Sequence, residues 1–189
     1  MEYVQPIRDK QKIKALKRLL KQRSARDYLF FVFGINTGMR VSDMLRIRAH
    51  DVIDESNKIR EFCNVRCENG ERMKSFYLNE KTKRAIKVYI SATPIDRSNY
   101  LFKSRKADNQ PITRQQAYRI INQAAREVGI TDKIGTHTLR KTFGYHAFIG
   151  GISISIIQAI FNHQTRKETL RYIGMDQSDN DKIKVDVNL

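Results

Sequence analysis

The sequence predicts a mainly α-helical domain with one small antiparallel β-sheet, an α+β fold. Three observations favour this class. Apolar residues recur at helical spacing along most of the chain, capping residues precede many of these runs, and two β-rich segments flank an Asn-Gly dipeptide. A length of 189 residues favours one domain, with two small ones as the alternative. No strong boundary divides the chain.

The first helix is predicted over residues 10–22. Ile13, Leu16 and Leu20 keep helical spacing, so their face turns inward and the lysines point outward. Residues 1–23 hold eight Lys or Arg against only Glu2 and Asp9. Such a segment also fits a disordered basic arm, but the apolar spacing favours an amphipathic helix.

The second helix is predicted to begin at a capping box, Ser24-Ala25-Arg26-Asp27, and to carry the apolar run from Tyr28 to Ile35. Gly34 and Gly38 loosen its end. After Gly38 the stretch "RVSDMLRI" resumes a helical pattern.

The sheet is predicted around residues 58–78. The segments "KIREFCNVR" and "MKSFYL" mix β-branched and aromatic residues on either side of Asn69-Gly70, which is a strong hairpin signal. We expect two or three antiparallel strands in this region.

Five further helices are predicted, most of them from a capping residue and an apolar pattern. The first is capped by Asn79 and extends to about Ser91, and the second covers residues 114–128, with Thr113 as its cap and Gly129 at its end. The third covers "THTLRKTFGYHAFIGG" up to Gly150-Gly151, and the fourth is the apolar "SISIIQAIF", which Asn162 closes. The fifth is a short helix that is capped by Thr165 and carries Tyr172.

The charge balance favours a polyanionic partner. The chain has 36 Lys and Arg against 20 Asp and Glu, a net charge of +16. Each phosphate that Lys or Arg neutralises releases a counterion, which strengthens binding. Solubility alone is the alternative, although an acidic excess would serve it at least as well.

Several classes of protein are disfavoured. No run approaches the ~18 apolar residues of a membrane span, and no signal-peptide pattern occurs. Two cysteines, Cys63 and Cys67, are too few for a disulfide scaffold, and a C-x3-C pair with scattered histidines is a poor zinc signature. We therefore expect a cytoplasmic protein that meets nucleic acid, with no membrane contact, metal or cofactor.

One candidate pair for phosphate binding is His137 and Arg140. Residues three apart share a helix face, so the imidazole and the guanidinium can address one ligand. The planar guanidinium makes bidentate hydrogen bonds to phosphate oxygens. By itself this spacing also fits a solvated helix face.

Three other candidate site residues, each taken alone, also fit an ordinary structural role. Arg40 follows a helix end where the chain turns, and it also fits a surface ion pair with Asp43. His163 fits a cap or an interior histidine, and Tyr172 fits the core, where tyrosine is commonly half-buried.

The order and spacing of these residues form a joint pattern. An Arg follows "TGM", H-x-x-R comes next, a His lies 23 residues after that second Arg, and a Tyr lies nine residues further on. In this pattern the chain resembles the tyrosine recombinases, the phage-integrase and Xer-type family. The stretches "NTGMRVSDMLRI", "HTLRKTF" and "FNHQTRKETLRYIG" match the motifs of the family, and the resemblance covers nearly the whole chain.

The resemblance implies the tyrosine-recombinase catalytic-domain fold and a site-specific recombinase that cuts and rejoins DNA through a 3′-phosphotyrosine, without metal or ATP. It implies that Arg40 and Arg140 clamp the scissile phosphate and that Tyr172 attacks it. His137 and His163 would donate hydrogen bonds or move protons beside it. Physically, two fixed guanidiniums favour the extra negative charge of the reacting phosphate, which Mg²⁺ supports elsewhere.

The chain departs from the family at the hairpin. A catalytic Lys, the general acid for the leaving 5′-oxygen, commonly lies two residues before the turn Gly, and here that position is Glu68, which has the wrong charge. Arg66, Arg72 or Lys74 lie in the same hairpin, but an Arg stays protonated and is a poor proton donor. We therefore expect slow cleavage or a rearranged hairpin, with Lys74 as the candidate replacement.

Two further departures follow. Lys141 stands after Arg140 where a His is common, and it fits either a phosphate contact or a solvated charge. Family members usually carry an N-terminal core-binding domain, for which this chain has no room before its first matched helix. We therefore expect residues 1–189 to be a single catalytic domain, either a fragment or a short member.

Alternatives to an active recombinase stay open. Glu68 motivates a DNA-binding accessory or regulatory relative with weak or lost cleavage, and a type IB topoisomerase would share the chemistry. We expect double-stranded DNA as the partner and a homotetramer on DNA, with a monomer as the alternative in isolation. Residues 176–189 form a polar tail that either docks on another protomer or frays.

Overall fold

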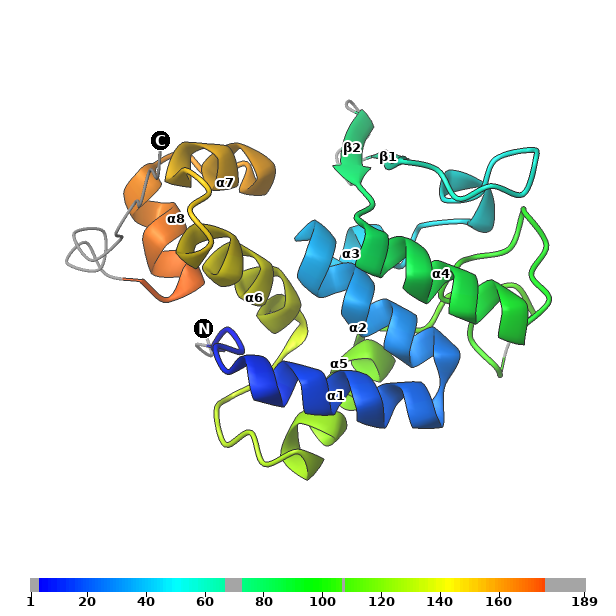
Figure 1. Ribbon diagram of the computed structural model, residues 1–189, viewed down its shortest axis with the longest axis horizontal. Coiled ribbons are helices and arrows are strands. Elements are labelled where there is room, and N and C mark those ends of the chain that lie inside the picture. Colours follow the sequence, from blue (N-terminus) through cyan, green and yellow to red (C-terminus); the bar gives the residue numbers. More distant parts are fainter. Residues whose placement is uncertain (1–3, 67–72, 107, 176–189) are drawn as a thin grey trace, which may run out of the picture.

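A computed structural model describes residues 4–66, 73–106 and 108–175 of the protein (Figure 1). It confirms a mainly helical fold with a small sheet. The elements in chain order are α1 Lys10–Arg23, α2 Ala25–Thr37, α3 Val41–Met44, a 3-10 turn at Ala49–Asp51, β1 Phe62–Arg66, β2 Met73–Tyr77, α4 Glu80–Ala92, α5 Arg114–Glu127, α6 Thr136–Ile149, α7 Ile154–Phe161 and α8 Arg166–Ile173.

The predicted N-caps are confirmed by their hydrogen bonds. Ser24, Asn79, Thr113 and Thr165 each accept a backbone N–H from the residue three positions later, which satisfies one of the unpaired donors at a helix start. The capping box is reciprocal at Thr113, where the side chain of Gln116 accepts the backbone N–H of Thr113.

The helix expected after Gly38 is much shorter than its pattern indicates. It ends at Met44, since the following backbone turns to pair with a distant segment: Leu101 N–H donates to the carbonyl of Ile47, and Arg48 bridges Tyr100. The apolar residues of the pattern are buried by this connection rather than by a continuing helix.

The predicted sheet is confirmed as a two-stranded antiparallel hairpin within the described residues. Its register pairs Cys63 with Phe76 and Val65 with Lys74. Cys63 and Val65 are buried, so these pairs share the inner face of the hairpin. The turn, with Asn69-Gly70, Glu68, Arg72 and Cys67, lies outside the described residues, as does the tail at 176–189.

Two hydrophobic clusters form the interior. The larger surrounds α2, whose residues from Leu29 to Phe33 are almost fully buried and which contacts α1, α4 and α6. The smaller lies among α6, α7 and α8 and includes Phe161 and Ile173. Since α6 contributes Leu139 to the larger cluster and Phe148 to the smaller, this helix joins the two.

Residues 4–8, which we call the N-terminal strap, cross α6 and reach the end of α8. Within the strap, Ile7 N–H donates to Thr142 Oγ1 at 2.9 Å, and the Ile7 carbonyl lies 2.9 Å from His146 Nε2. Arg8 Nη2 donates to the carbonyl of Gly174 at 2.8 Å. The sequence pattern predicted only the helix that follows the strap.

Candidate active site

Tyr172 lies on α8, the last described helix, and is half-buried against the smaller hydrophobic cluster. Its ring packs edge-on against His163 and Phe161, with centroid distances of 4.9 and 5.4 Å. Its hydroxyl lies 3.2 Å from Nδ1 of His137. The phenol therefore contacts both predicted histidines, one through its ring and one through its oxygen.

Arg140 lies one turn after His137 on α6, and its side chain is buried. The guanidinium donates to the carbonyl of Gly38 at the end of α2 and to the carbonyl of Phe161 at the end of α7. It also stacks 4.2 Å from the centre of the Phe161 ring. Arg140 is thus held from three sides, and this fixed position is what a preorganised phosphate ligand requires.

The turn after α2 positions Arg40 near Arg140 and Tyr172. Gly38 adopts a left-handed conformation with φ 66°, and an added Cβ would lie 2.4 Å from Phe143 of α6. Met39 is buried, and the next side chain, that of Arg40, is exposed. The backbone carbonyl of Arg40 accepts the first hydrogen bonds of α3. Arg40 therefore lies at a junction between α2, α3 and α6.

His163 follows Asn162, which closes α7 in the predicted left-handed conformation with φ 54°. Its Nδ1 lies 3.1 Å from Thr169 Oγ1, and that hydroxyl donates its only proton to the carbonyl of Thr165. Nδ1 of His163 must then be the donor. In the neutral ring this leaves the lone pair on Nε2, where it can accept a hydrogen bond or a proton.

Burial and positive charge set the protonation of the site. Burial raises the pKa of Tyr172, while the charges of Arg140 and Arg40 lower it. Burial also lowers the pKa of His137, with further contributions from Lys141, Arg140 and Arg40 among other cations. The pKa of His163 is lowered mainly by burial as well. The two imidazoles are therefore neutral at pH 7 and can accept a proton.

Arg140 shows the cost of this arrangement. The pKa of Arg140 is lowered to about 10, mainly by burial and also by the charge of Arg40, although Tyr172 and Asp43 oppose the effect. Two guanidiniums this close repel each other, and a bound anion would relieve that repulsion.

Lys141 is not the solvated charge that was one of the two alternatives for its sequence position. Its side chain is buried rather than solvated, and its Nζ donates to the carbonyl of Val4 in the strap at 2.9 Å. The ammonium lies 5.1 Å from the centre of the Tyr172 ring, which is cation–π distance. Lys141 thus joins the strap to the face of the phenol.

The hairpin presents its described cations on different faces. Lys74 is half-buried and shares the inner face with Val65, whereas Arg66 is exposed and pairs with Met73 on the outer face. The Lys74 side chain therefore lies on the face of the hairpin that packs toward the rest of the protein. Glu68, at the usual lysine position, lies outside the described residues.

The structure brings the five predicted residues together, from the α2–α3 turn, α6, the end of α7 and α8. Sequence reasoning missed Thr169 and the role of Lys141. Thr169 lies four residues after Thr165 on α8, so helical spacing places its hydroxyl over the first turn, but no local pattern shows that His163 folds back onto it.

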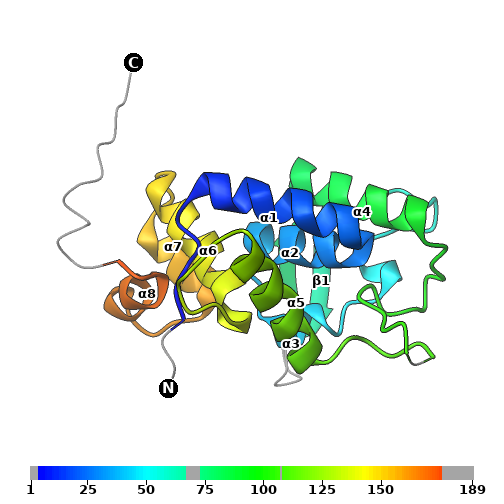
Figure 2. The same cartoon turned by 90° about the horizontal axis from the view of Figure 1, so that it is seen from below.

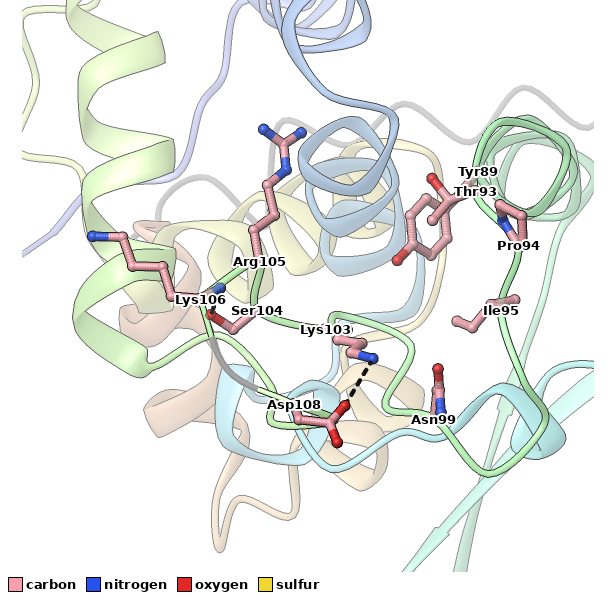
Figure 3. A pocket seen from close by; sticks show the side chains of 10 residues that line it. All are labelled: Tyr89, Thr93, Pro94, Ile95, Asn99, Lys103, Ser104, Arg105, Lys106 and Asp108. Carbon is pink, nitrogen blue, oxygen red and sulfur yellow. Dashed lines mark hydrogen bonds and ion pairs between the residues drawn. The ribbon is translucent and has the colours of Figure 1, made fainter.

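Other candidate sites lack this convergence. A pocket near the end of α4 is lined by polar and basic residues, including Lys103 and Asp108, whose side chains pair at 3.6 Å (Figure 3). It contains none of the five predicted residues. Within the described ranges, no cluster of three His, Cys, Asp or Glu could hold a metal, and no helix is long and apolar enough to cross a membrane.

Comparison with known families decides the class of this chain. Residues 8–178 match the model of the phage integrase family. The chain belongs to the phage integrase family. This is a family of tyrosine recombinases, whose members act in site-specific DNA recombination.

Curated relatives of this integrase-family chain carry recombinase names. The probable integrase/recombinase YoeC of Bacillus subtilis is 40% identical over 177 residues, which are 94% of this chain and 93% of that protein. Tyrosine recombinase XerA of Pyrococcus furiosus is 28% identical over 86% of this chain, but only 54% of XerA is covered.

Solved integrase-family structures confirm the predicted fold. A crystal structure of XerA recombinase matches 96% of this chain and 65% of that chain, with a TM-score of 0.76 at 22% identity. A lambda integrase dimer bound to a COC' core site matches the whole of this chain and 65% of that chain, with a TM-score of 0.71 at 13% identity. The α+β fold is therefore that of the tyrosine-recombinase catalytic domain.

Proposed function

We propose that this protein is a site-specific DNA recombinase that breaks and rejoins double-stranded DNA through a covalent phosphotyrosine at Tyr172. One observation carries the proposal: the Tyr172 hydroxyl lies 3.2 Å from His137 Nδ1, beside the charges of Arg140 and Arg40. A weak nucleophile, a neutral base and two cations therefore meet at one point, which suits attack on a phosphodiester.

The proposed cleavage step exchanges one phosphoester bond for another. The Tyr172 oxygen attacks the scissile phosphorus as its proton passes to His137, and a Tyr–O–P bond forms while the bond from phosphorus to the 5′-oxygen breaks. The leaving 5′-oxygen takes a proton and becomes a hydroxyl. Because the new ester keeps the bond free energy, a 5′-hydroxyl of a second strand can reverse the step without ATP.

Each proposed group has a distinct task. Arg40 and Arg140 hold the non-bridging oxygens and favour the extra negative charge of the transition state. The neutral His137 accepts the phenol proton. His163, whose Nδ1–H donates to Thr169, has its lone pair on Nε2, and it donates from Nε2 to a phosphate oxygen only once that nitrogen has taken a proton. The raised pKa of Tyr172 fits a nucleophile that stays protonated until its proton is removed by the adjacent base.

Lys74 is the proposed proton donor for the leaving group. Its inner-face position on the hairpin favours it over the exposed Arg66, and a lysine ammonium releases its proton far more readily than a guanidinium. The proposed assembly is a single catalytic domain acting as four protomers on DNA, without a cofactor. A relative that binds DNA and has lost cleavage is the competing reading.

A suicide DNA substrate separates these readings. We expect wild-type protein to form a covalent adduct on its cognate site that resists denaturation, and Tyr172→Phe to form none, a loss of at least about 10³-fold since the nucleophile is absent. Tyr145→Phe, which alters a half-buried tyrosine on α6, is the matched control and should retain the adduct.

One combination of results would contradict the catalytic proposal. If wild-type protein binds the site in a salt-dependent way but forms no adduct, and Tyr172→Phe binds equally well, the protein is a DNA-binding relative without strand cleavage. Adduct formation that persists in Tyr172→Phe would assign the nucleophile to another residue.

A further inference from the structure

A row of lysines runs along one side of α1. Lys10, Lys14, Lys17 and Lys21 follow one another at spacings of four, three and four residues, which places them in a line on the helix surface. We call this set the lysine stripe. At 1.5 Å rise per residue it is about 16 Å long. The buried face of α1, with Ile13, Leu16 and Leu20, is a separate face of the same helix.

The stripe continues onto a second helix. Lys17 is half-buried, and its pKa is lowered first by burial and then by the charge of Lys81 on α4. Lys81 and the neighbouring Arg84 are exposed. Two helices therefore contribute cations to one surface, close enough together to repel each other.

Folding does not explain this arrangement. Like charges three or four residues apart destabilise a helix, and cations in its first turns oppose the helix dipole. Helix α1 contains no acidic residue, and no ion pair of the stripe is found among the described residues. By contrast Arg23, on another side of α1, pairs with Glu127 of α5. The stripe thus carries a repulsion that a polyanion would relieve.

The surroundings of the stripe favour nucleic acid over other anionic partners. A protein interface has an apolar centre, and a membrane-binding helix presents large apolar residues beside its cations. The exposed large apolar side chains lie on the hairpin, α5, α6 and α7, or between the last two, and none lies on α1 or α4. The surface therefore offers charge alone, which suits a phosphate backbone read without regard to sequence.

The position of the stripe separates it from the candidate active site. Helices α1 and α4 lie along one side of α2, and α3, which Arg40 begins, lies on the opposite side (Figure 2). A duplex held beside Arg40 and Tyr172 would not cover the stripe. Over about 16 Å a duplex presents about nine phosphates, enough to engage all four amines of the stripe.

We propose that the lysine stripe, with Lys81 and Arg84, is a second DNA-binding surface that holds a duplex on the side of the protein away from Tyr172. Such a surface lets one protomer hold two DNA segments at once. The inference requires that the protein binds DNA at the proposed active site, but it does not require that Tyr172 reacts, so Tyr172→Phe protein tests it equally well.

A capture assay tests the second surface. Tyr172→Phe protein is bound to an immobilised duplex, and a fluorescent duplex of random sequence is then added. We expect the labelled duplex to be captured, and the fourfold variant in which Lys10, Lys14, Lys17 and Lys21 become Gln to lose at least about tenfold of this capture. The slope of log affinity against log salt for the second duplex should become shallower by about 3 to 4, one contact for each lysine.

A charge-matched control removes four exposed cations elsewhere, Lys58, Arg105, Lys106 and Arg126, each changed to Gln. It should keep the capture, although its net charge equals that of the stripe variant. Thermal unfolding should show the stripe variant at least as stable as the parent, because the repulsion is removed, and Lys17→Gln alone should weaken capture in a fully folded protein.

Three results would overturn the proposal. The first is the absence of capture by the parent protein. The second is equal capture by parent and stripe variant, or equal loss in the control, which would assign bridging to protein association or to net charge. The third is stripe-dependent binding of phosphatidylserine vesicles or poly-glutamate without stripe-dependent binding of DNA, which would assign the surface to a membrane or an acidic protein.

Discussion

The Lys141 ammonium lies between the strap and the phenol ring of Tyr172, and its charge acts on His137 one turn earlier in α6. Burial first, and then this charge, lower the pKa of His137, so that it stays neutral at a pH at which an ordinary histidine begins to take a proton. At the residue scale, a side chain that touches no reacting atom therefore helps to set the pH range in which the proposed base works.

Substituting Lys141 tests this through the pH dependence of adduct formation. The pKa of His137 is lowered, so the rate should fall only when the pH drops below 6.5. In Lys141→Met the charge that contributes to the lowered pKa of His137 is absent. The acid limb of the pH–rate profile, where the rate falls as His137 takes a proton, should therefore move to higher pH. Lys141→Arg keeps the charge and should leave the limb in place. Coincident acid limbs for wild type and Lys141→Met would contradict this assignment.

Folding stability should respond with the same sign. As the pH falls through 6.5, the unfolded chain binds a proton at His137 before the folded protein does, so stability is lost below that pH and the loss ends below the folded pKa. Lys141→Met should also cost about 1.5–3 kcal/mol of unfolding free energy, because the carbonyl of Val4 loses a charged donor.

Thr169 holds His163 through a single hydroxyl, so its removal should affect chemistry more than folding. In Thr169→Val the donor Nδ1 of His163 loses its acceptor, and the single-turnover cleavage rate should fall about 10- to 100-fold as the ring loses its orientation. Thr169→Ser restores the hydroxyl and should restore most of the rate. A Val variant as fast as the Ser variant would remove Thr169 from the site.

The predicted residues differ in how much of their setting the sequence reveals. Tyr172, His163 and Arg140 were predicted from order and spacing, which reflect the chemistry of the family. The burial of Lys141 was not predictable, because its partner Val4 lies 137 positions away and offers only a backbone carbonyl. Local patterns carry helix faces and caps, but not such long-range backbone contacts.

At the scale of elements, the packing of α8 against α6 depends on a missing side chain. Gly144 lies on α6, and an added Cβ would lie 2.6 Å from Cγ2 of Ile173 and 2.8 Å from the ring of Phe161. This close approach seats α8, and with it Tyr172, on the smaller cluster. The sequence pattern predicted both helices and the Thr165 cap of α8, but not the distance between the two helices.

Gly144→Ala should therefore destabilise the protein, although alanine favours helix. Overpacking of about 1–3 kcal/mol outweighs a propensity gain of up to about 1 kcal/mol, and adduct formation should fall because α8 shifts. Chemical denaturation measures the first effect. In a double-mutant cycle with Ile173→Ala, which empties the contacted space, the combined cost should be smaller than the sum of the single costs. Simple additivity would show that the two sites do not touch.

At the scale of the whole molecule, Arg140 connects the two hydrophobic clusters. It donates to the end of α2 on one side and to the end of α7 on the other. A substitution of Arg140 therefore removes a buried charge with its partners left unpaired, and it loosens the junction as well as the phosphate site. Lost activity in such a variant combines both effects, whereas Tyr172→Phe changes the nucleophile alone.

The N-terminal strap has a consequence for the synthesis of the protein. Its hydrogen bonds to Lys141, Thr142, His146 and Gly174 join residues 135 to 166 positions apart. At typical ribosomal rates, residues 4–8 wait about 10–30 s before Gly174 is made. Three of these bonds go to α6 and one goes to the end of α8, so the strap can close completely only after α8 has been made, which is also when Tyr172 takes its place beside His137.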